Sequence, residues 1–143
     1  MTKTILAGAA FTVLLALAPA SFAATVDYSA DLKASSEVPP NGSAGVGQLM
    51  ATYDTASKKL VYTATYNGLT GPATMAHFHG PAAPGVNAGI VVPVKDMTPN
   101  TLHGETTLTD AQAADLAAGK WYFNIHTAAN KGGEIRGQVM KSK

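Results

Sequence analysis

Short runs of β-forming residues recur along this chain, separated by clusters of glycine, proline and asparagine, and this spacing most constrains its fold. Such spacing is typical of an antiparallel sandwich or barrel. One helix interrupts the pattern, because Thr109 and Gln112 form a capping box and Gly119 supplies a stop signal. The sequence therefore predicts an all-β fold with one short connecting helix, and strands over residues 26–32, 46–54, 60–66, 75–79, 90–94, 102–107, 121–127 and 134–140.

Alternation along residues 121–127 predicts which face of that strand is buried. The odd positions carry Trp121, Phe123 and Ile125, which are large and apolar, whereas the even positions are more polar. Successive side chains of a strand point to opposite faces, so the odd face belongs to the core. The same rule places Phe78 toward the core.

The strand over residues 121–127 can pair with the last strand through a glycine-rich turn. The register that keeps core residues together sets Phe123 opposite Gly137 and Asn124 opposite Arg136. We expect Gly137 to leave room for the Phe123 ring, and Arg136 to lie on the polar face with Glu134. These two residues either form a cross-strand polar ladder, which we favour, or orient His126 or clamp a carboxylate substrate.

Two histidines two positions apart, His77 and His79, fall in a predicted strand. They would share one face, with backbones roughly 7 Å apart. His126 lies on the corresponding polar face of its own strand, and neutral imidazole suits copper and zinc. The pattern predicts a metal site formed by His77, His79 and His126, with the thioether of Met75 as a further candidate ligand. The alternative is a set of ordinary histidines on a solvated sheet face.

Other polar residues near these histidines have supporting roles in this interpretation. Asn124 and Thr127 are expected to hydrogen-bond the ligating rings, and not to bind the metal. His103 is expected to be exposed and separate from the site, and Glu37 could cap a loop or reach the site. With no cysteine and no Gly-x-Ser-x-Gly motif, no catalytic nucleophile is predicted.

The first 23 residues resemble a Sec-type signal peptide. Lys3 precedes an apolar stretch over residues 5–18, and Ser21 and Ala23 form a small-x-small cleavage site. The apolar stretch is shorter than the roughly 20 residues of a membrane span. We therefore expect cleavage after Ala23 and a periplasmic or secreted protein. Loss of Lys3 would leave nine basic and nine acidic residues, which disfavours nucleic-acid binding.

Four sequence blocks resemble the CHRD domain, the module named after chordin. They are Glu37-Val38-Pro39-Pro40 and residues 76–82, 122–127 and 133–138, in the family's order. The resemblance covers nearly all of residues 24–143, which we take as one CHRD domain, and it implies an immunoglobulin-like antiparallel β-sandwich. Phe78, where the family usually has an aliphatic residue, and Lys131, where it commonly has proline, depart from the pattern.

The His-x-His strand also resembles the copper side of Cu/Zn superoxide dismutases. The four histidines of this chain are too few for the paired copper and zinc site of those enzymes, but a single copper ion remains consistent with them. We expect an exported, non-enzymatic protein that binds one copper ion for sequestration or handling. The alternative is a metal-free module that docks a protein or glycan, and a small copper oxidase or dismutase is a third hypothesis.

Overall fold

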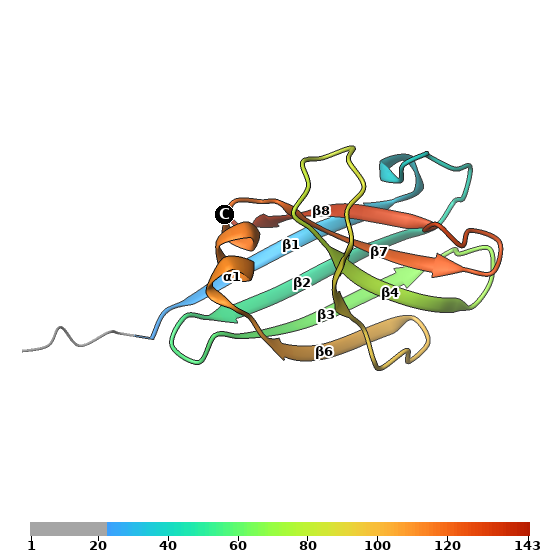
Figure 1. The fold of residues 1–143 in the computed structure, drawn as a ribbon. Helices are drawn as coiled ribbons and strands as arrows, with labels where there is room; N and C mark the ends of the chain where they lie inside the picture. Colours follow the sequence, from blue (N-terminus) through green and yellow to red (C-terminus); the bar gives the residue numbers. More distant parts are fainter. Residues whose placement is uncertain (1–22) are drawn as a thin grey trace, which may run out of the picture.

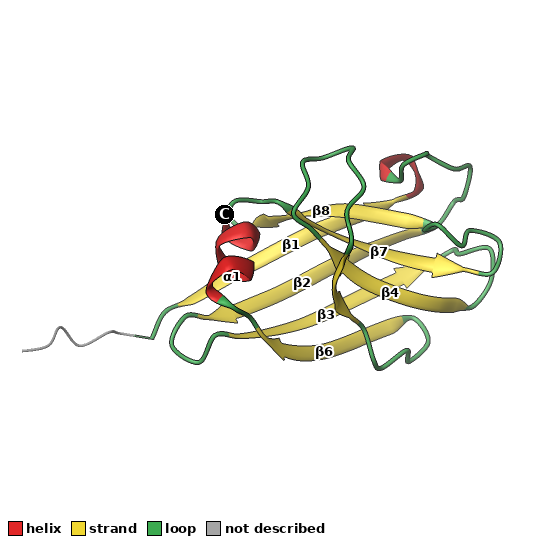
Figure 2. Ribbon diagram, in the orientation of Figure 1, coloured by secondary structure: helices red, strands yellow, loops and turns green. Residues whose placement is uncertain are grey.

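The computed structural model describes residues 23–143, and most of the predicted signal peptide lies outside the described residues. All eight predicted strands are present, each with boundaries within two residues of those expected (Figures 1 and 2). The elements are β1 (Thr25–Lys33), η1 (Ala34–Ser36), β2 (Val46–Asp54), β3 (Lys59–Asn67), β4 (Ala73–His79), β5 (Ile90–Pro93), β6 (Thr101–Thr107), α1 (Asp110–Ala117), β7 (Trp121–Thr127) and β8 (Ile135–Lys141).

The strands form one antiparallel sheet in the order β5-β4-β7-β8-β1-β2-β3-β6. The sheet curls until its two edges approach each other, and an isolated bridge between Asp96 and His103 joins the segment after β5 to β6. The all-β prediction is confirmed. A two-sheet sandwich of immunoglobulin type is not confirmed, because the pairing runs through all eight strands as a nearly closed sheet.

The core lies inside the curled sheet. Along β3, buried and exposed residues alternate without interruption, as expected for a strand with one face in the core. Aromatic rings contact each other across the interior: the ring centroids of Tyr62 and Phe78 are 5.0 Å apart, and those of Phe78 and Phe123 are 4.8 Å apart. The apolar face predicted for residues 121–127 is therefore the core face.

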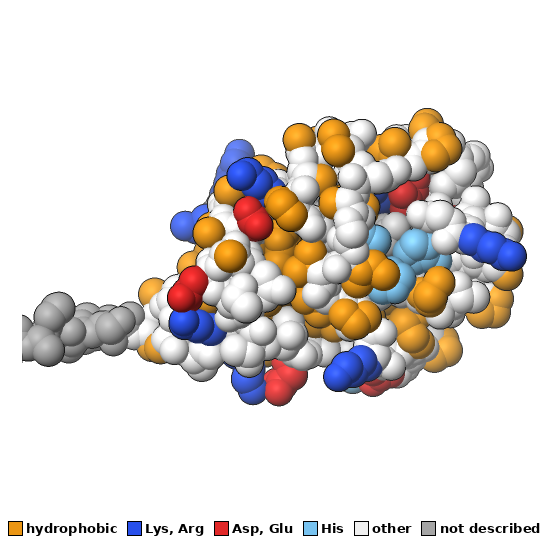
Figure 3. Space-filling model, viewed as in Figure 1, with side chains coloured by type: hydrophobic (Ala, Val, Ile, Leu, Met, Phe, Trp, Pro, Cys, Tyr) orange, Lys and Arg blue, Asp and Glu red, His pale blue; other side chains and the backbone are white. Residues whose placement is uncertain are grey.

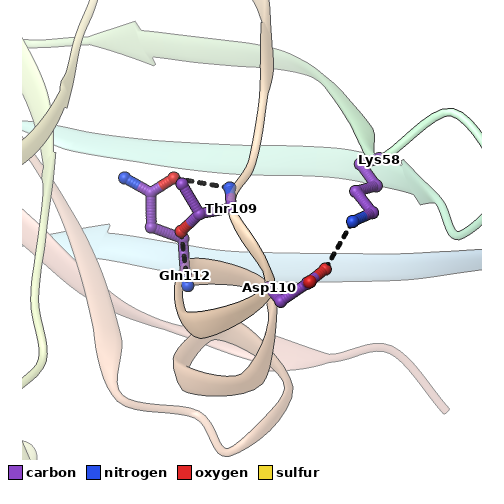
Figure 4. Close-up of polar contacts among 4 residues, drawn as sticks. All are labelled: Lys58, Thr109, Asp110 and Gln112. Carbon is purple, nitrogen blue, oxygen red and sulfur yellow. Dashed lines mark hydrogen bonds and ion pairs between the residues drawn. The ribbon is translucent and has the colours of Figure 1, made fainter.

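The helix closes one end of the sheet between β6 and β7. Its predicted capping box is present: the Thr109 hydroxyl accepts from the Gln112 amide, and the Gln112 side chain accepts from the Thr109 amide (Figure 4). Lys58 and Asp110 are 2.6 Å apart and tie the first turn of the helix to the β2–β3 hairpin (Figure 4). None of the described helices is long and apolar enough to span a membrane.

The predicted register of β7 and β8 is confirmed, with Phe123 opposite Gly137 and Asn124 opposite Arg136. The expected reason for the glycine is wrong. A Cβ on Gly137 would meet the backbone carbonyl of Asp31 in the neighbouring strand β1, and the Phe123 ring is not among its nearest contacts. Close approach of two backbones therefore explains this glycine.

Residues on both faces of β7 are buried, so the alternative of ordinary histidines on a solvated sheet face is wrong. Asn124 is 2 % exposed, Arg136 2 % and Glu134 0 %. Loops between β1 and β2 and between β4 and β5 lie over this side of the sheet (Figure 1). Ser43 of the first loop bonds Glu134, and Asn87 of the second bonds Arg136. The loops therefore turn the polar face into a second, polar interior.

Candidate metal centre

Two neighbouring strands, β4 and β7, position the candidate ligands. In their antiparallel register His77 lies opposite Asn124, and Met75 lies opposite His126. Residues two apart in a strand share a face, so His77 and His79 of β4 point to the same side as Asn124 and His126 of β7. The pairing of the two strands thus brings together side chains that are about fifty positions apart in the sequence.

The three predicted histidines do converge on one point. One ring nitrogen of each lies within 4.8 Å of the other two, and Nδ1 of His77 is 3.1 Å from Nε2 of His126. His77 and His79 are each 8 % exposed, and His126 is 6 % exposed. Figure 3 shows histidine atoms on the visible face of the molecule, next to hydrophobic side chains. The sequence-based grouping of these residues is therefore correct in space.

Backbone carbonyls hold the outer nitrogens of two of these rings. Nδ1 of His79 is 2.9 Å from the carbonyl oxygen of Ala88, and Nδ1 of His126 is 2.9 Å from that of Lys131. A carbonyl can only accept, so each Nδ1 must carry the proton. In the neutral ring the inner Nε2 then has a free lone pair. Metal-binding histidines in proteins are usually held in this way.

Burial keeps two of the rings in the neutral form. Desolvation and, to a smaller extent, the neighbouring His126 and His79 lower the pKa of His77 to about 4. Burial also lowers the pKa of His79, although its hydrogen bonds to Ala88 and Asn124 oppose the shift. Both imidazoles are thus available as nitrogen donors at neutral pH.

The side chain of Asn124 enters the centre of the cluster. Its Oδ1 is 3.0 Å from Nε2 of His79 and 3.0 Å from Nε2 of His126. The sequence predicted a supporting hydrogen-bonding role for Asn124, and its oxygen does contact both rings. These contacts are to the inner ring nitrogens of the cluster.

Glu37 lies behind Asn124, on the side away from the histidines. The Glu37 side chain is 5 % exposed. A Cβ on Gly133 would meet both Oε1 of Glu37 and Nδ2 of Asn124, so these two atoms lie on the same side of Gly133. Oε1 has no hydrogen-bond partner among the described residues. Burial raises the pKa of this carboxyl, against the charge of Arg136, which lowers it. The sequence left the role of Glu37 open, although its motif marked the position.

A stack of three side chains borders the cluster, and sequence reasoning missed its middle member, Tyr122. The Tyr122 ring is parallel to that of His79, with centroids 4.7 Å apart and an angle of 4° between the planes. The guanidinium of Arg136 lies 3.4 Å above the other side of the Tyr122 ring. The alternation that picked out Asn124 and His126 includes Tyr122 and could have indicated this position.

Glu134 and Thr127 bond each other, and Glu134 also accepts hydrogen bonds from Ser43, Asn130 and both the amide and hydroxyl of Thr70. Desolvation would raise the pKa of Glu134, but these hydrogen bonds lower it to about 2. The Glu134 carboxylate thus fixes the loops around the histidines, including the turn that contains Lys131.

The remaining candidates lie at the periphery. Met75 is 49 % exposed and lies opposite His126 in the register of the two strands. His103 is on β6, where its ring lies 3.0 Å from an Asp96 carboxylate oxygen; both side chains are exposed. His103 is thus exposed, as predicted, and is not one of the three grouped histidines.

Comparison with known families agrees with the motif blocks described above. A family model described as the CHRD domain matches residues 28–139, which is most of the chain. Comparison with curated proteins and with solved structures gave no match. The match over residues 28–139 shows that this chain belongs to the CHRD domain family.

Proposed function

We propose that this CHRD-domain protein is exported and binds a single copper ion, in a role of copper sequestration or handling. The observation that carries the proposal is the convergence of three imidazole nitrogens from His77, His79 and His126. Two of those rings are already held in the metal-binding tautomer by carbonyls. The site therefore needs little rearrangement to accept an ion.

The chemistry of the donors favours copper over other divalent ions. Imidazole nitrogen suits copper and zinc, and at a given site Cu²⁺ binds more tightly than Zn²⁺ in the Irving–Williams order. Hard ions such as Mg²⁺ and Ca²⁺ prefer an all-oxygen site. The three rings are more than nine-tenths buried, which suits retention of an ion better than presentation of an open position to a substrate.

Titration of the purified protein with Cu(II) tests the proposal. We expect one equivalent to bind, with hyperfine structure from nitrogen ligands in the electron paramagnetic resonance spectrum. His77→Ala and His126→Ala should each weaken binding at least tenfold, whereas His103→Ala, on the exposed part of β6, should bind as the wild type does. Unchanged copper affinity in both His77→Ala and His126→Ala would falsify the site.

Export is supported by the charged, apolar and small-x-small pattern of residues 1–23. The expected mature N-terminus is Ala24. Intact-mass measurement on protein from the periplasm or medium tests this, and a soluble cytoplasmic protein that keeps Met1 would contradict it.

The second candidate function is a metal-free module that docks a protein or glycan. Exposed apolar side chains near the histidines favour it: Met75 is 49 % exposed and Ile90, opposite His79, is 56 % exposed. A protein that takes up no metal in the titration would favour this alternative.

A further inference from the structure

Three of the atoms at the centre of the site can only accept hydrogen bonds. Nε2 of His79 and Nε2 of His126 lack protons in the neutral rings, because their Nδ1 atoms donate to the carbonyls of Ala88 and Lys131. Oδ1 of Asn124 faces both nitrogens at 3.0 Å and is also only an acceptor. Three lone-pair donors therefore point at one another with no proton between them.

Three of the distances between these atoms are close to those between ligands around one small cation. At metal–nitrogen distances of about 2.0–2.1 Å, two ligands in a tetrahedron lie roughly 3.3 Å apart. The pairs from Oδ1 to the two Nε2 atoms measure 3.0 Å, and Nδ1 of His77 is 3.1 Å from Nε2 of His126. A small movement outward would accommodate an ion at the centre.

The surroundings of Asn124 determine which way its amide points. Nδ2 and the carboxyl oxygen Oε1 of Glu37 both lie next to Gly133. A Cβ on Gly133 would collide with these two atoms, so the residue must be glycine. Nδ2 thus lies on the side of this carboxyl, and Oδ1 lies on the side of the imidazoles. Asn124 is 2 % exposed, so no solvent competes for its amide.

We propose that Asn124 Oδ1 is the fourth ligand of the metal, so that the site offers three imidazole nitrogens and one amide oxygen to a divalent ion. The assignment rests on the proposed metal-binding function and makes it more specific. An oxygen donor beside three imidazoles suits Cu(II) or Zn(II), whereas Cu(I) is selected by soft sulfur ligands. The site thus holds copper in its divalent form.

Amide orientation can be measured on the wild-type protein loaded with Zn(II), which is diamagnetic. Nuclear Overhauser contacts from the Asn124 Nδ2 protons should reach the Hα protons of Gly133. Contacts to the ring protons of His79 and His126 would show the reversed amide and overturn the assignment. Because this measurement needs no variant, loss of folding cannot obscure it.

The second measurement counts exchangeable water on bound Cu(II) by pulsed electron paramagnetic resonance in D₂O. Asn124→Ala should gain one coordinated water relative to the wild type and lose at least tenfold in Cu(II) affinity. Asn67→Ala is the control, because Asn67 is an exposed residue at the end of β3. It should leave the water signal unchanged.

The outcomes separate the two proposals. A wild-type protein that binds no copper overturns the proposed function and the ligand assignment together. Copper binding with an unchanged water signal in a folded Asn124→Ala variant overturns only the assignment of the fourth ligand.

Discussion

Arg136 carries a full charge into the interior, at 2 % exposure. Its guanidinium donates to Oδ1 of Asn87 at 2.8 Å and to the carbonyl oxygen of Val86 at 2.6 Å, and it stacks on the Tyr122 ring. Through these contacts one side chain joins β8, the β4–β5 loop and the ring that supports His79. The sequence placed Arg136 on the polar face of the sheet, and in the structure that face is covered and the guanidinium is buried.

Replacing Arg136 by Gln should destabilise the protein by about 2–4 kcal/mol, because charge-assisted hydrogen bonds and a buried stacking contact are lost together. Urea unfolding at pH 7 measures the change. Lys59→Gln provides the control, since Lys59 bonds Glu105 on the surface, and its unfolding midpoint should hardly move. Equal effects of the two substitutions would contradict the buried role of Arg136.

Gly137 is a second residue whose neighbours determine its tolerance to change. A Cβ there would be 2.9 Å from the backbone carbonyl carbon of Asp31 and 3.1 Å from Cβ of Ala30, and neither strand can yield easily. We expect Gly137→Ala to cost about 1–3 kcal/mol through overpacking. Gly132→Ala, where nothing lies within 4 Å, should be close to neutral in the same thermal unfolding assay. A neutral Gly137→Ala would show that β1 and β8 approach less closely than described.

Among the elements, β7 shows what alternation can and cannot predict. The alternation of apolar and polar residues along β7 identified its apolar face. It also identified the register with β8, because a shift by one residue would place polar residues opposite apolar ones. It did not show that the polar face is buried. That depends on the loops that contain Ser43 and Asn87, which are far from β7 in the sequence.

The same limit applies to the candidate site on β4 and β7. The His-x-His spacing and the position of His126 were enough to predict the histidine cluster, because strand geometry alone fixes which face they share. The inward direction of the Asn124 oxygen was not predicted, and the sequence left open whether Glu37 reaches the site. Both depend on side-chain orientation and on Gly133, which leaves room for the carboxyl group.

For the whole molecule, buried titratable groups make the stability of the metal-free protein depend on pH. The pKa of His77 is lowered from 6.5 to about 4, so unfolding takes up a proton between these values. Glu134, with its pKa lowered from 4.5 to about 2, does the same at lower pH. Stability should therefore fall as the pH drops from about 6.5 to 4, and fall again toward 2.

Urea midpoints of the metal-free protein from pH 7 to pH 3 measure this fall. Glu37 opposes it, because burial raises its pKa and its folded form holds a proton more readily. The urea midpoint should therefore fall more steeply with decreasing pH in Glu37→Gln than in the wild type. In His77→Gln the midpoint should change less between pH 6.5 and pH 4. A midpoint that stays constant from pH 7 to pH 4 in both wild type and Glu37→Gln would be inconsistent with neutral buried histidines.

The order of the strands links the candidate metal site to the local stability of one edge of the sheet. Strands β5 and β4 are the last two at one end of the sheet, and among the strands of residues 23–143 it is β7 that pairs them with the rest. The histidines straddle that pairing, two on β4 and one on β7. An ion bound by the three histidines would cross-link β4 to β7. Its binding free energy would oppose local unfolding of β5 and β4. Removal of the ion would favour local unfolding first along β5. At this edge, an isolated bridge between Asp96 and His103 connects the segment after β5 to β6, the strand at the opposite edge of the sheet.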